Sequence, residues 1–146
     1  MPKFSFQPAT EEDAARLADL RVRAMRESLQ SAGRFDEDRA RQRLLCDYAA
    51  GRTTLVTFRG DLAGFYVLKE TGGELLLQHL YIDPPFQSQG LGAQVLVRIF
   101  EDADSRRLPI RVGALKGSAS NRFYGRHGFV KESETEFDVV YLRLPR

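Results

Sequence analysis

A glycine-bearing turn between an apolar segment and a helical segment is the part of the sequence best suited to bind a ligand. It runs from Gln87 to Gly92 and has glycine at positions 90 and 92. Glycine lets the main chain approach a ligand closely, and the free N–H groups at the start of a helix carry a partial positive charge. The turn could therefore hold a pyrophosphate through its main chain. Taken alone, the segment fits an ordinary strand-to-helix turn equally well, because such turns often contain glycine only to make the bend.

Two common phosphate-binding loops do not fit this turn. A Walker loop needs Gly-Lys followed by Ser or Thr, which the segment lacks. A dinucleotide-binding loop needs a third glycine where this chain has Val95. A phosphate bound here would be held by a different kind of loop.

The sequence around the turn predicts the elements that position it. An apolar strand from Glu74 to Ile82 precedes the turn, and residues from Ala93 to Phe100 have helical spacing. Alternating or β-branched segments predict further strands at 4–6, 53–58, 62–69, 110–114 and 139–144. Helical periodicity predicts helices near 11–28, from a cap at Asp36 to Gly51, and at 118–127. This order, without a linker or repeat, indicates a single domain over residues 1–146.

Two blocks of sequence occur in this order at a distinctive spacing. The first is Gln87-x-x-Gly90-x-Gly92 after an apolar strand, and the second runs from Phe123 through Tyr124 to Gly128-Phe129. Together they resemble the GNAT N-acetyltransferase superfamily, closely over residues 74–129 and less specifically over the whole chain. The resemblance implies an α/β (α+β) fold, in which helices flank a mixed, mostly antiparallel twisted sheet. Two central strands, 75–82 and 110–114, should run parallel and splay apart.

The resemblance also implies acetyl-CoA as co-substrate and indicates where it binds. The main chain of Leu80, Tyr81 and Ile82 should pair with the pantetheine arm as a neighbouring strand would. The pyrophosphate should be held by backbone amides of Gln87, Ser88, Gln89, Gly90, Leu91 and Gly92. The family's coenzyme-contacting asparagine usually lies six or seven residues before the tyrosine, where this chain has Ser118 and Gly117. Ser118 or Asn121 is therefore expected to replace it.

Tyr124 matches the position of the family's proton donor. A tyrosine near the departing sulfur can release its proton as negative charge develops there. The structural alternative is an aromatic residue that packs the short helix onto the sheet beside Phe123 and Phe129.

The proton acceptor is less defined. The family often places Glu or His four or six residues before the final apolar residue of the strand, where this chain has Gln78 and Leu76. His79 has a suitable intrinsic pKa, but strand alternation points it away from the face of Gln78 unless a bulge re-aims it. Two alternatives stay open: His79 is the base, or water removes the proton while Gln78 helps to position the substrate.

The resulting hypothesis is direct transfer of an acetyl group to a primary amine of a small molecule or peptide, in a ternary complex. Cys46 has helix-period apolar neighbours and is expected to be a buried small residue rather than a nucleophile. The alternative is a non-catalytic acetyl-CoA or CoA sensor or interaction module, which the missing base favours.

Composition narrows the remaining functions. The 146 residues are 42% hydrophobic and 29% charged with net charge +2, which is typical of a globular protein and gives nucleic-acid binding little support. The apolar runs are too short to cross a membrane, and the N-terminus does not read as a secretory signal. With one cysteine, a disulfide or Cys-based zinc site is not expected. We expect a cytoplasmic protein without metal, nucleic-acid or membrane partners, for which a homodimer stays open.

Overall fold

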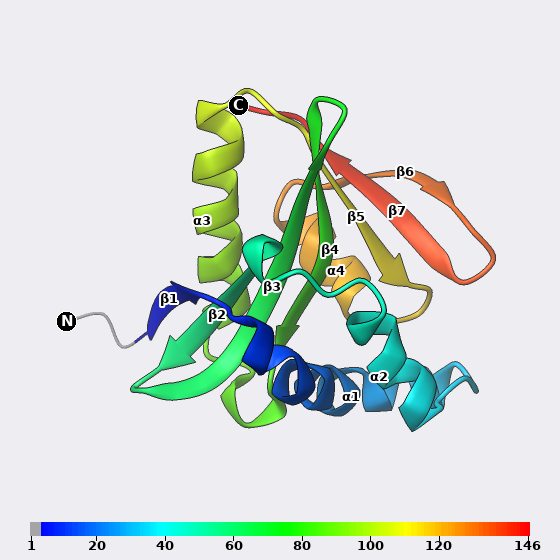
Figure 1. The fold of residues 1–146 in the computed structure, drawn as a ribbon. Coiled ribbons are helices and arrows are strands. Elements are labelled where there is room, and N and C mark those ends of the chain that lie inside the picture. The colour runs from blue at the N-terminus through cyan, green and yellow to red at the C-terminus, as the bar shows by residue number, and fades with distance from the viewer. Residues whose placement is uncertain (1–3) are drawn as a thin grey trace. The chain divides into compact units, whose positions relative to one another are not determined.

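The computed structural model describes residues 4–146, which form a seven-stranded sheet and its helices (Figure 1). The strand order is β1-β2-β3-β4-β5-β7-β6, with β4 and β5 parallel. The strands are β1 (Phe4–Pro8), β2 (Thr53–Phe58), β3 (Asp61–Thr71), β4 (Glu74–Ile82), β5 (Ile110–Leu115), β6 (Val130–Glu134) and β7 (Asp138–Arg143). The helices are α1 (Ala14–Ser31), α2 (Glu37–Leu45), α3 (Leu91–Ser105) and α4 (Ser120–Arg126). The predicted fold class, a mostly antiparallel sheet flanked by helices, is confirmed.

Contacts between Cα atoms divide the chain into two compact units. The first holds the residues up to Val67 together with His79–Gly92, and the second holds Leu68–Gln78 with Ala93–Arg146. The single domain expected for residues 1–146 stays a prediction. Residues 1–3, part of the segment expected to lack a secretory signal, lie outside the described residues.

The first unit is built on β1, β2 and β3, which pair antiparallel from Phe4 opposite Phe58 to Thr53 opposite Val67. Helix α1 buries one face at helical spacing, and α2 adds Leu44 to the same core. That core contains Ala9, Leu17, Ala18, Leu20, Leu44, Leu55, Phe65 and Val67, with Tyr81 packed at its margin. The predicted cap at Asp36 is confirmed, because its side chain accepts a hydrogen bond from the Arg39 N–H at 3.1 Å.

The second helix is shorter than its sequence pattern predicts. It ends at Leu45 rather than near Gly51, because the Tyr48 N–H bonds to Leu45 O three residues back, which tightens the last turn. The Tyr48 hydroxyl donates to Thr10 O at 2.7 Å, which fixes this segment outside the helix. The expected burial of Cys46 is wrong for the same reason, since the residue follows the end of the helix and is exposed.

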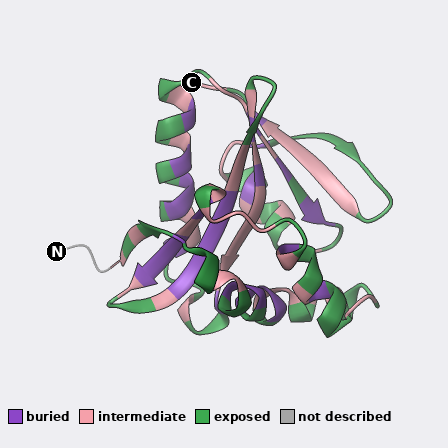
Figure 2. Cartoon of the chain, viewed as in Figure 1, coloured by how far each residue is buried: buried purple, intermediate pink, exposed green. Residues whose placement is uncertain are grey.

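The second unit contains the parallel pair, in which Leu75–Leu77 of β4 lie opposite Ile110–Val112 of β5. This confirms the predicted parallel arrangement. The two strands are also expected to splay apart. That part of the arrangement involves residues of both units and stays a prediction. Helix α3 buries Val95, Leu96, Ile99 and Ala103, the side coloured as buried in Figure 2. Strand β6, which was not predicted, forms an antiparallel hairpin with β7.

The end of β7 is fixed to α3 by an ion pair whose arginine is buried. Arg143 is 4% exposed and donates to both carboxylate oxygens of Asp104, at 2.9 and 3.0 Å. Its guanidinium also lies over the Phe100 ring, 3.8 Å from the centroid. The hydrogen bonds from Arg143 lower the pKa of Asp104, so the carboxylate stays charged well into the acid range.

Candidate functional site

The turn between β4 and α3 is held together by local hydrogen bonds. A short 3-10 helix, Pro84–Phe86, follows the strand, and Asp83 O accepts the Phe86 N–H at 2.8 Å. The Gln87 side chain folds back, and its Nε2 donates to Ile82 O at 2.8 Å. The side chain of Gln87 therefore closes the turn onto the end of the strand.

The middle of the turn is exposed to solvent. Residues 87–90 are exposed, and Ser88 and Gly90 have φ of +64° and +81°. A Cβ on Gly90 would meet nothing within 4 Å, so glycine is required there for its backbone angle rather than for lack of space. The first turn of α3 has no acidic residue that would offset the positive end of the helix. These features fit a pyrophosphate held by backbone amides.

A bidentate ion pair anchors the start of the turn to α1. Asp83 is 8% exposed, and Arg23 donates to both of its carboxylate oxygens at 2.9 Å. The hydrogen bond to Asp83 raises the pKa of Arg23. The Asp83 N–H also donates to Ala63 O of β3 at 2.8 Å. Sequence reasoning missed this pair, because the two residues lie 60 positions apart and neither belongs to a motif.

The strand segment predicted to pair with pantetheine lies tightly against β3. Leu80, Tyr81 and Ile82 are half-buried. A Cβ added to Gly64 of β3 would lie 2.4 Å from Tyr81 O and 3.3 Å from Ile82 Cα. Only glycine fits at position 64, so this residue sets how closely β3 approaches the end of β4.

His79 and Tyr81 share one face of β4, as strand alternation predicts. His79 Nδ1 lies 2.9 Å from the Tyr81 hydroxyl, which accepts a hydrogen bond from Arg21 Nε of α1 at 2.9 Å. Burial lowers the pKa of His79 to about 3, and the charges of Arg21 and Arg43 lower it too, whereas the charge of Asp47 raises it. The imidazole is therefore neutral at physiological pH and is a weak proton acceptor.

Tyr124 is buried in α4 among other aromatic rings. It is 5% exposed, and its ring centroid lies 5.4 Å from Phe123, 5.3 Å from Phe129 and 6.3 Å from Tyr141. The helix ends at His127, whose Nδ1 lies 2.8 Å from Phe123 O, followed by Gly128 at φ +90°. The Tyr124 ring thus packs beside Phe123 and Phe129, as the structural alternative predicts. The role of its hydroxyl as a proton donor stays a prediction.

Asn121 and Ser118 form a closed hydrogen-bond group at the start of α4. The Asn121 amide nitrogen donates to Leu115 O at 2.9 Å and to Ser118 O at 3.0 Å. Its amide oxygen accepts from the Tyr141 hydroxyl at 2.9 Å. Both amide protons are thus engaged within the protein, which leaves Asn121 better suited to shape the loop than to contact a ligand. Tyr141 was not foreseen, because its partner lies 20 residues away.

The predicted site residues fall into two groups. His79 to Ile82 and Gln87 to Gly92 lie in the first unit, whereas Gln78, Ser118, Asn121 and Tyr124 lie in the second. Gln78 is half-buried in β4. Within the described residues, no group of three His, Cys, Asp or Glu side chains could hold a metal ion. In the same range, no helix has the length and apolar character needed to span a bilayer.

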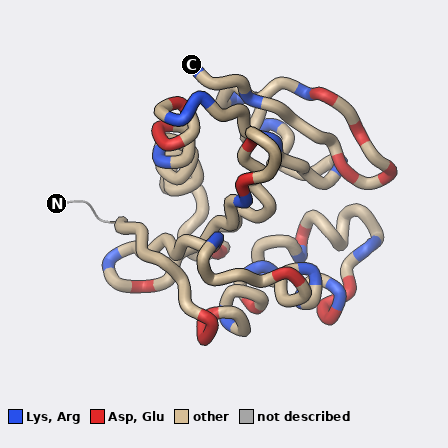
Figure 3. Tube along the Cα trace, turned by 45° about the horizontal axis from the view of Figure 1, so that its top comes forward, with Lys and Arg blue, Asp and Glu red and all other residues tan. Residues whose placement is uncertain are grey.

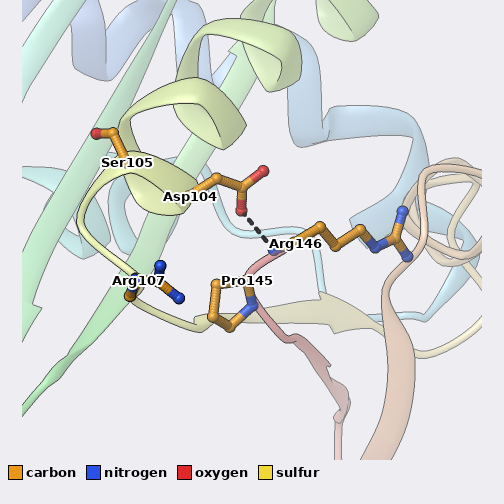
Figure 4. A pocket seen from close by; sticks show the side chains of 5 residues that line it. All are labelled: Asp104, Ser105, Arg107, Pro145 and Arg146. Carbon is orange, nitrogen blue, oxygen red and sulfur yellow. Dashed lines mark hydrogen bonds between the residues drawn. The ribbon is translucent and has the colours of Figure 1, made fainter.

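A hollow of about 430 Å³ lies at the C-terminal end of α3 and is lined by none of the predicted site residues. Its lining residues are Asp104, Ser105, Arg107, Pro145 and Arg146 (Figure 4). The Arg146 N–H donates to Asp104 Oδ1 at 3.1 Å, so the carboxylate there is already engaged.

The sequence from residue 50 to residue 131, more than half of the chain, matches the family model described as an acetyltransferase (GNAT) domain. The chain therefore belongs to the GNAT acetyltransferase family. Family membership confirms the predicted class, an acetyl-CoA-dependent acetyltransferase. A comparison with curated proteins finds no match.

Solved structures with the same fold include three named acetyl-transfer proteins. PaiA N-acetyltransferase from Thermoplasma acidophilum, solved with coenzyme A, is 16% identical with a TM-score of 0.81, over 98% of this chain and 99% of that chain. The ribosomal-protein-S18-alanine N-acetyltransferase from Escherichia coli is 17% identical with a TM-score of 0.71, over 97% and 93%. N-acetylglutamate synthase from Neisseria gonorrhoeae, solved with coenzyme A and N-acetyl-glutamate, is 16% identical with a TM-score of 0.70, over 100% and 36%. At these identities the likeness establishes the fold.

Proposed function

We propose that this protein transfers the acetyl group of acetyl-CoA to a primary amine of a small molecule or peptide, by direct attack in a ternary complex. The observation that carries the proposal is the turn from Gln87 to Gly92, which is exposed over residues 87–90 directly before α3, in a chain of this family. The solved relatives give the proposal its acceptor chemistry, since one is named for an alanine of a ribosomal protein and another is bound to N-acetyl-glutamate.

Acetyl-CoA would bind through main-chain groups on both sides of the turn. The amides of Gln87, Ser88, Gln89, Gly90, Leu91 and Gly92 would hold the pyrophosphate. The pantetheine arm would pair with Leu80–Ile82, where β3 covers one edge of β4. Ser118 would contact the arm, and Asn121 would hold the Ser118 loop in shape through its bonds to Leu115 O and Ser118 O.

In the reaction, the neutral amine nitrogen attacks the thioester carbonyl carbon. A C–N bond forms, the C–S bond breaks, and the thiolate of coenzyme A leaves. Tyr124 would give the thiolate a proton, and the amine would lose one to water, with Gln78 helping to position the acceptor. We assign the proton to water rather than to His79, because a group with a pKa near 3 is a weak acceptor for an ammonium proton.

Acetyl-CoA consumption across a panel of amines tests the proposal, with coenzyme A binding measured in parallel by calorimetry. The panel contains free amino acids, polyamines, aminoglycosides and peptides with free N-termini. Thiol release that depends on one class of amine supports transfer. Coenzyme A binding without turnover on the whole panel would instead favour the sensor alternative. A cytoplasmic location and a homodimer stay predictions that this assay does not address.

A further inference from the structure

Arg21 is a buried cation without a carboxylate partner among the described residues. It is 7% exposed, and its bonds run from Nε to the Tyr81 hydroxyl at 2.9 Å and from Nη1 to Ala40 O at 2.8 Å. The exposed charges of α1 and α2 are of both signs (Figure 3), and Arg41 pairs there with Asp19 and Glu37. Arg21 differs from these residues in being buried without a carboxylate partner in the described range. Two hydrogen bonds and the Tyr81 ring, 5.5 Å away at its centroid, stabilise its charge, and an anion beside it would stabilise the charge further.

Two donor atoms of Arg21 and His79 are free to bind a ligand, because they have no hydrogen-bond partner among the described residues and are not fully buried. Within residues 4–146, the only buried side-chain nitrogen or oxygen atoms without a hydrogen bond are Arg52 Nη1 and Arg143 Nε. Arg21 Nη2 and His79 Nε2 have no hydrogen-bond partner in this part of the chain, and neither is one of those buried atoms. Both atoms therefore keep at least a small accessible surface.

The hydrogen bonds also define where the histidine proton lies. Arg21 Nε can only donate, so the Tyr81 oxygen accepts there and keeps its own proton for His79 Nδ1. All three groups are satisfied when His79 Nδ1 accepts, which leaves the imidazole proton on Nε2. His79 then offers an N–H donor on the same side of β4 as Arg21, and the Tyr81 hydroxyl fixes both residues.

The charges around these donors favour an anion. Arg21 of α1 and Arg43 of α2 both act on His79, and Asp47 is the one acidic group that opposes them. Asp47 Oδ1 lies 3.8 Å from Arg52 Nη2, so the positive charge of Arg52 already offsets part of the Asp47 charge. An ammonium group would be disfavoured here, whereas a carboxylate would be attracted.

We propose that Arg21, Tyr81 and His79 form a carboxylate-binding edge of the acceptor site, and that the acceptor is a free amino acid. Its carboxylate accepts hydrogen bonds from Arg21 Nη2 and His79 Nε2, while its amine is acetylated. Tyr81 is a positioning residue, because it acts by holding the other two. The inference rests on the proposed function and adds the substrate class to it. His79 sits one residue before Leu80, where the pantetheine arm is proposed to begin, so a carboxylate bound there lies beside the reacting end of the strand.

Matched acceptors test the inference on the unaltered protein. Each of a set of amino acids is compared with its carboxamide and with its decarboxylated amine, by acetyl-CoA-dependent thiol release. A charge-assisted hydrogen bond of ordinary strength predicts kcat/KM about 10- to 100-fold higher for the amino acid. Equal rates for the three forms would overturn the carboxylate-binding edge and leave acetyl transfer intact. No turnover with any form or any other amine would overturn the proposed function itself.

Variants then assign the selectivity to these residues. Arg21→Gln should reduce the preference for the carboxylated acceptor to near one, and Arg21→Lys should restore part of it. His79→Gln keeps a donor near the Nε2 position, so it should retain more of the preference for the carboxylated acceptor than His79→Leu. This pair of variants tests the inference even if the Arg21 variants fold poorly. Arg16→Gln, an exposed arginine on the same helix, is the control and should keep the full preference. An unchanged preference in Arg21→Gln and His79→Leu would show that both side chains are only structural.

Discussion

The turn after β4 and the polar group formed by Arg21, His79 and Tyr81 lie in the same unit, but they are assembled from different parts of the chain. The turn is closed by bonds between residues a few positions apart, such as Gln87 with Ile82. The polar group joins Arg21 to Tyr81 across 60 residues. The turn uses main-chain atoms, which any sequence with the right glycines can present. The polar group depends on specific side chains. If the turn binds coenzyme A and the polar group binds the acceptor, as proposed, substitutions in one should leave binding at the other largely unchanged.

Replacing Gly90 is expected to have the largest effect, because it breaks the turn itself. Gly90→Glu places a Cβ at φ +81° and a carboxylate where the pyrophosphate is proposed to bind. We expect calorimetry to detect no coenzyme A binding. Gly60→Glu is a matched control, since Gly60 has φ +89° and the same open surroundings. If Gly90→Glu bound as tightly as Gly60→Glu, the turn would not be the coenzyme site.

Tyr124→Phe separates side-chain chemistry from main-chain binding. If Tyr124 protonates the leaving thiolate, kcat should fall by about 100- to 10,000-fold, while coenzyme A affinity stays within a factor of about two. Tyr66→Phe also removes a buried tyrosine hydroxyl, from outside the proposed site, and should keep its turnover. Equal turnover in both variants would leave Tyr124 as a packing residue.

Sequence could predict the turn, and most of the elements around it, because their signals are local. Glycine, proline and caps act within a few residues, and alternation agrees with the contact between His79 and Tyr81 on one face of β4. Helix α2 was predicted to be too long. Its periodicity does not show that the Tyr48 hydroxyl bonds to Thr10 O, which holds this residue outside the helix. The Arg23–Asp83 and Arg21–Tyr81 pairs could not be predicted, because each depends on how α1 packs against residues 60 positions later.

The Arg23–Asp83 pair allows a test of whether side chains also support the turn. Arg23→Met leaves a buried carboxylate without its partner, whereas Asp83→Asn leaves a guanidinium whose side chain is 49% exposed and can bond to water. We therefore expect a loss of unfolding free energy of about 2–3 kcal/mol for Arg23→Met and about 1 kcal/mol for Asp83→Asn, by urea denaturation. Coenzyme A affinity should weaken in the same order. A larger loss for Asp83→Asn would contradict this account of burial at the pair.

The smallest expected effect is a dependence of stability on pH that comes from His79. Its pKa is about 3 in the folded protein, against an ordinary value near 6.5 in the unfolded chain. Between these values the unfolded state binds a proton that the folded state does not, so the unfolding free energy falls as the pH falls below about 6.5. The loss between pH 7 and pH 5 should be at most about 2 kcal/mol, and less if solvent reaches the ring. His79→Gln lacks this proton, so urea unfolding at the two pH values should show a smaller loss for the variant. Equal losses would mean that the imidazole titrates normally. His79 would then again be a candidate for the base, and it would not be the neutral donor that the carboxylate-binding edge requires.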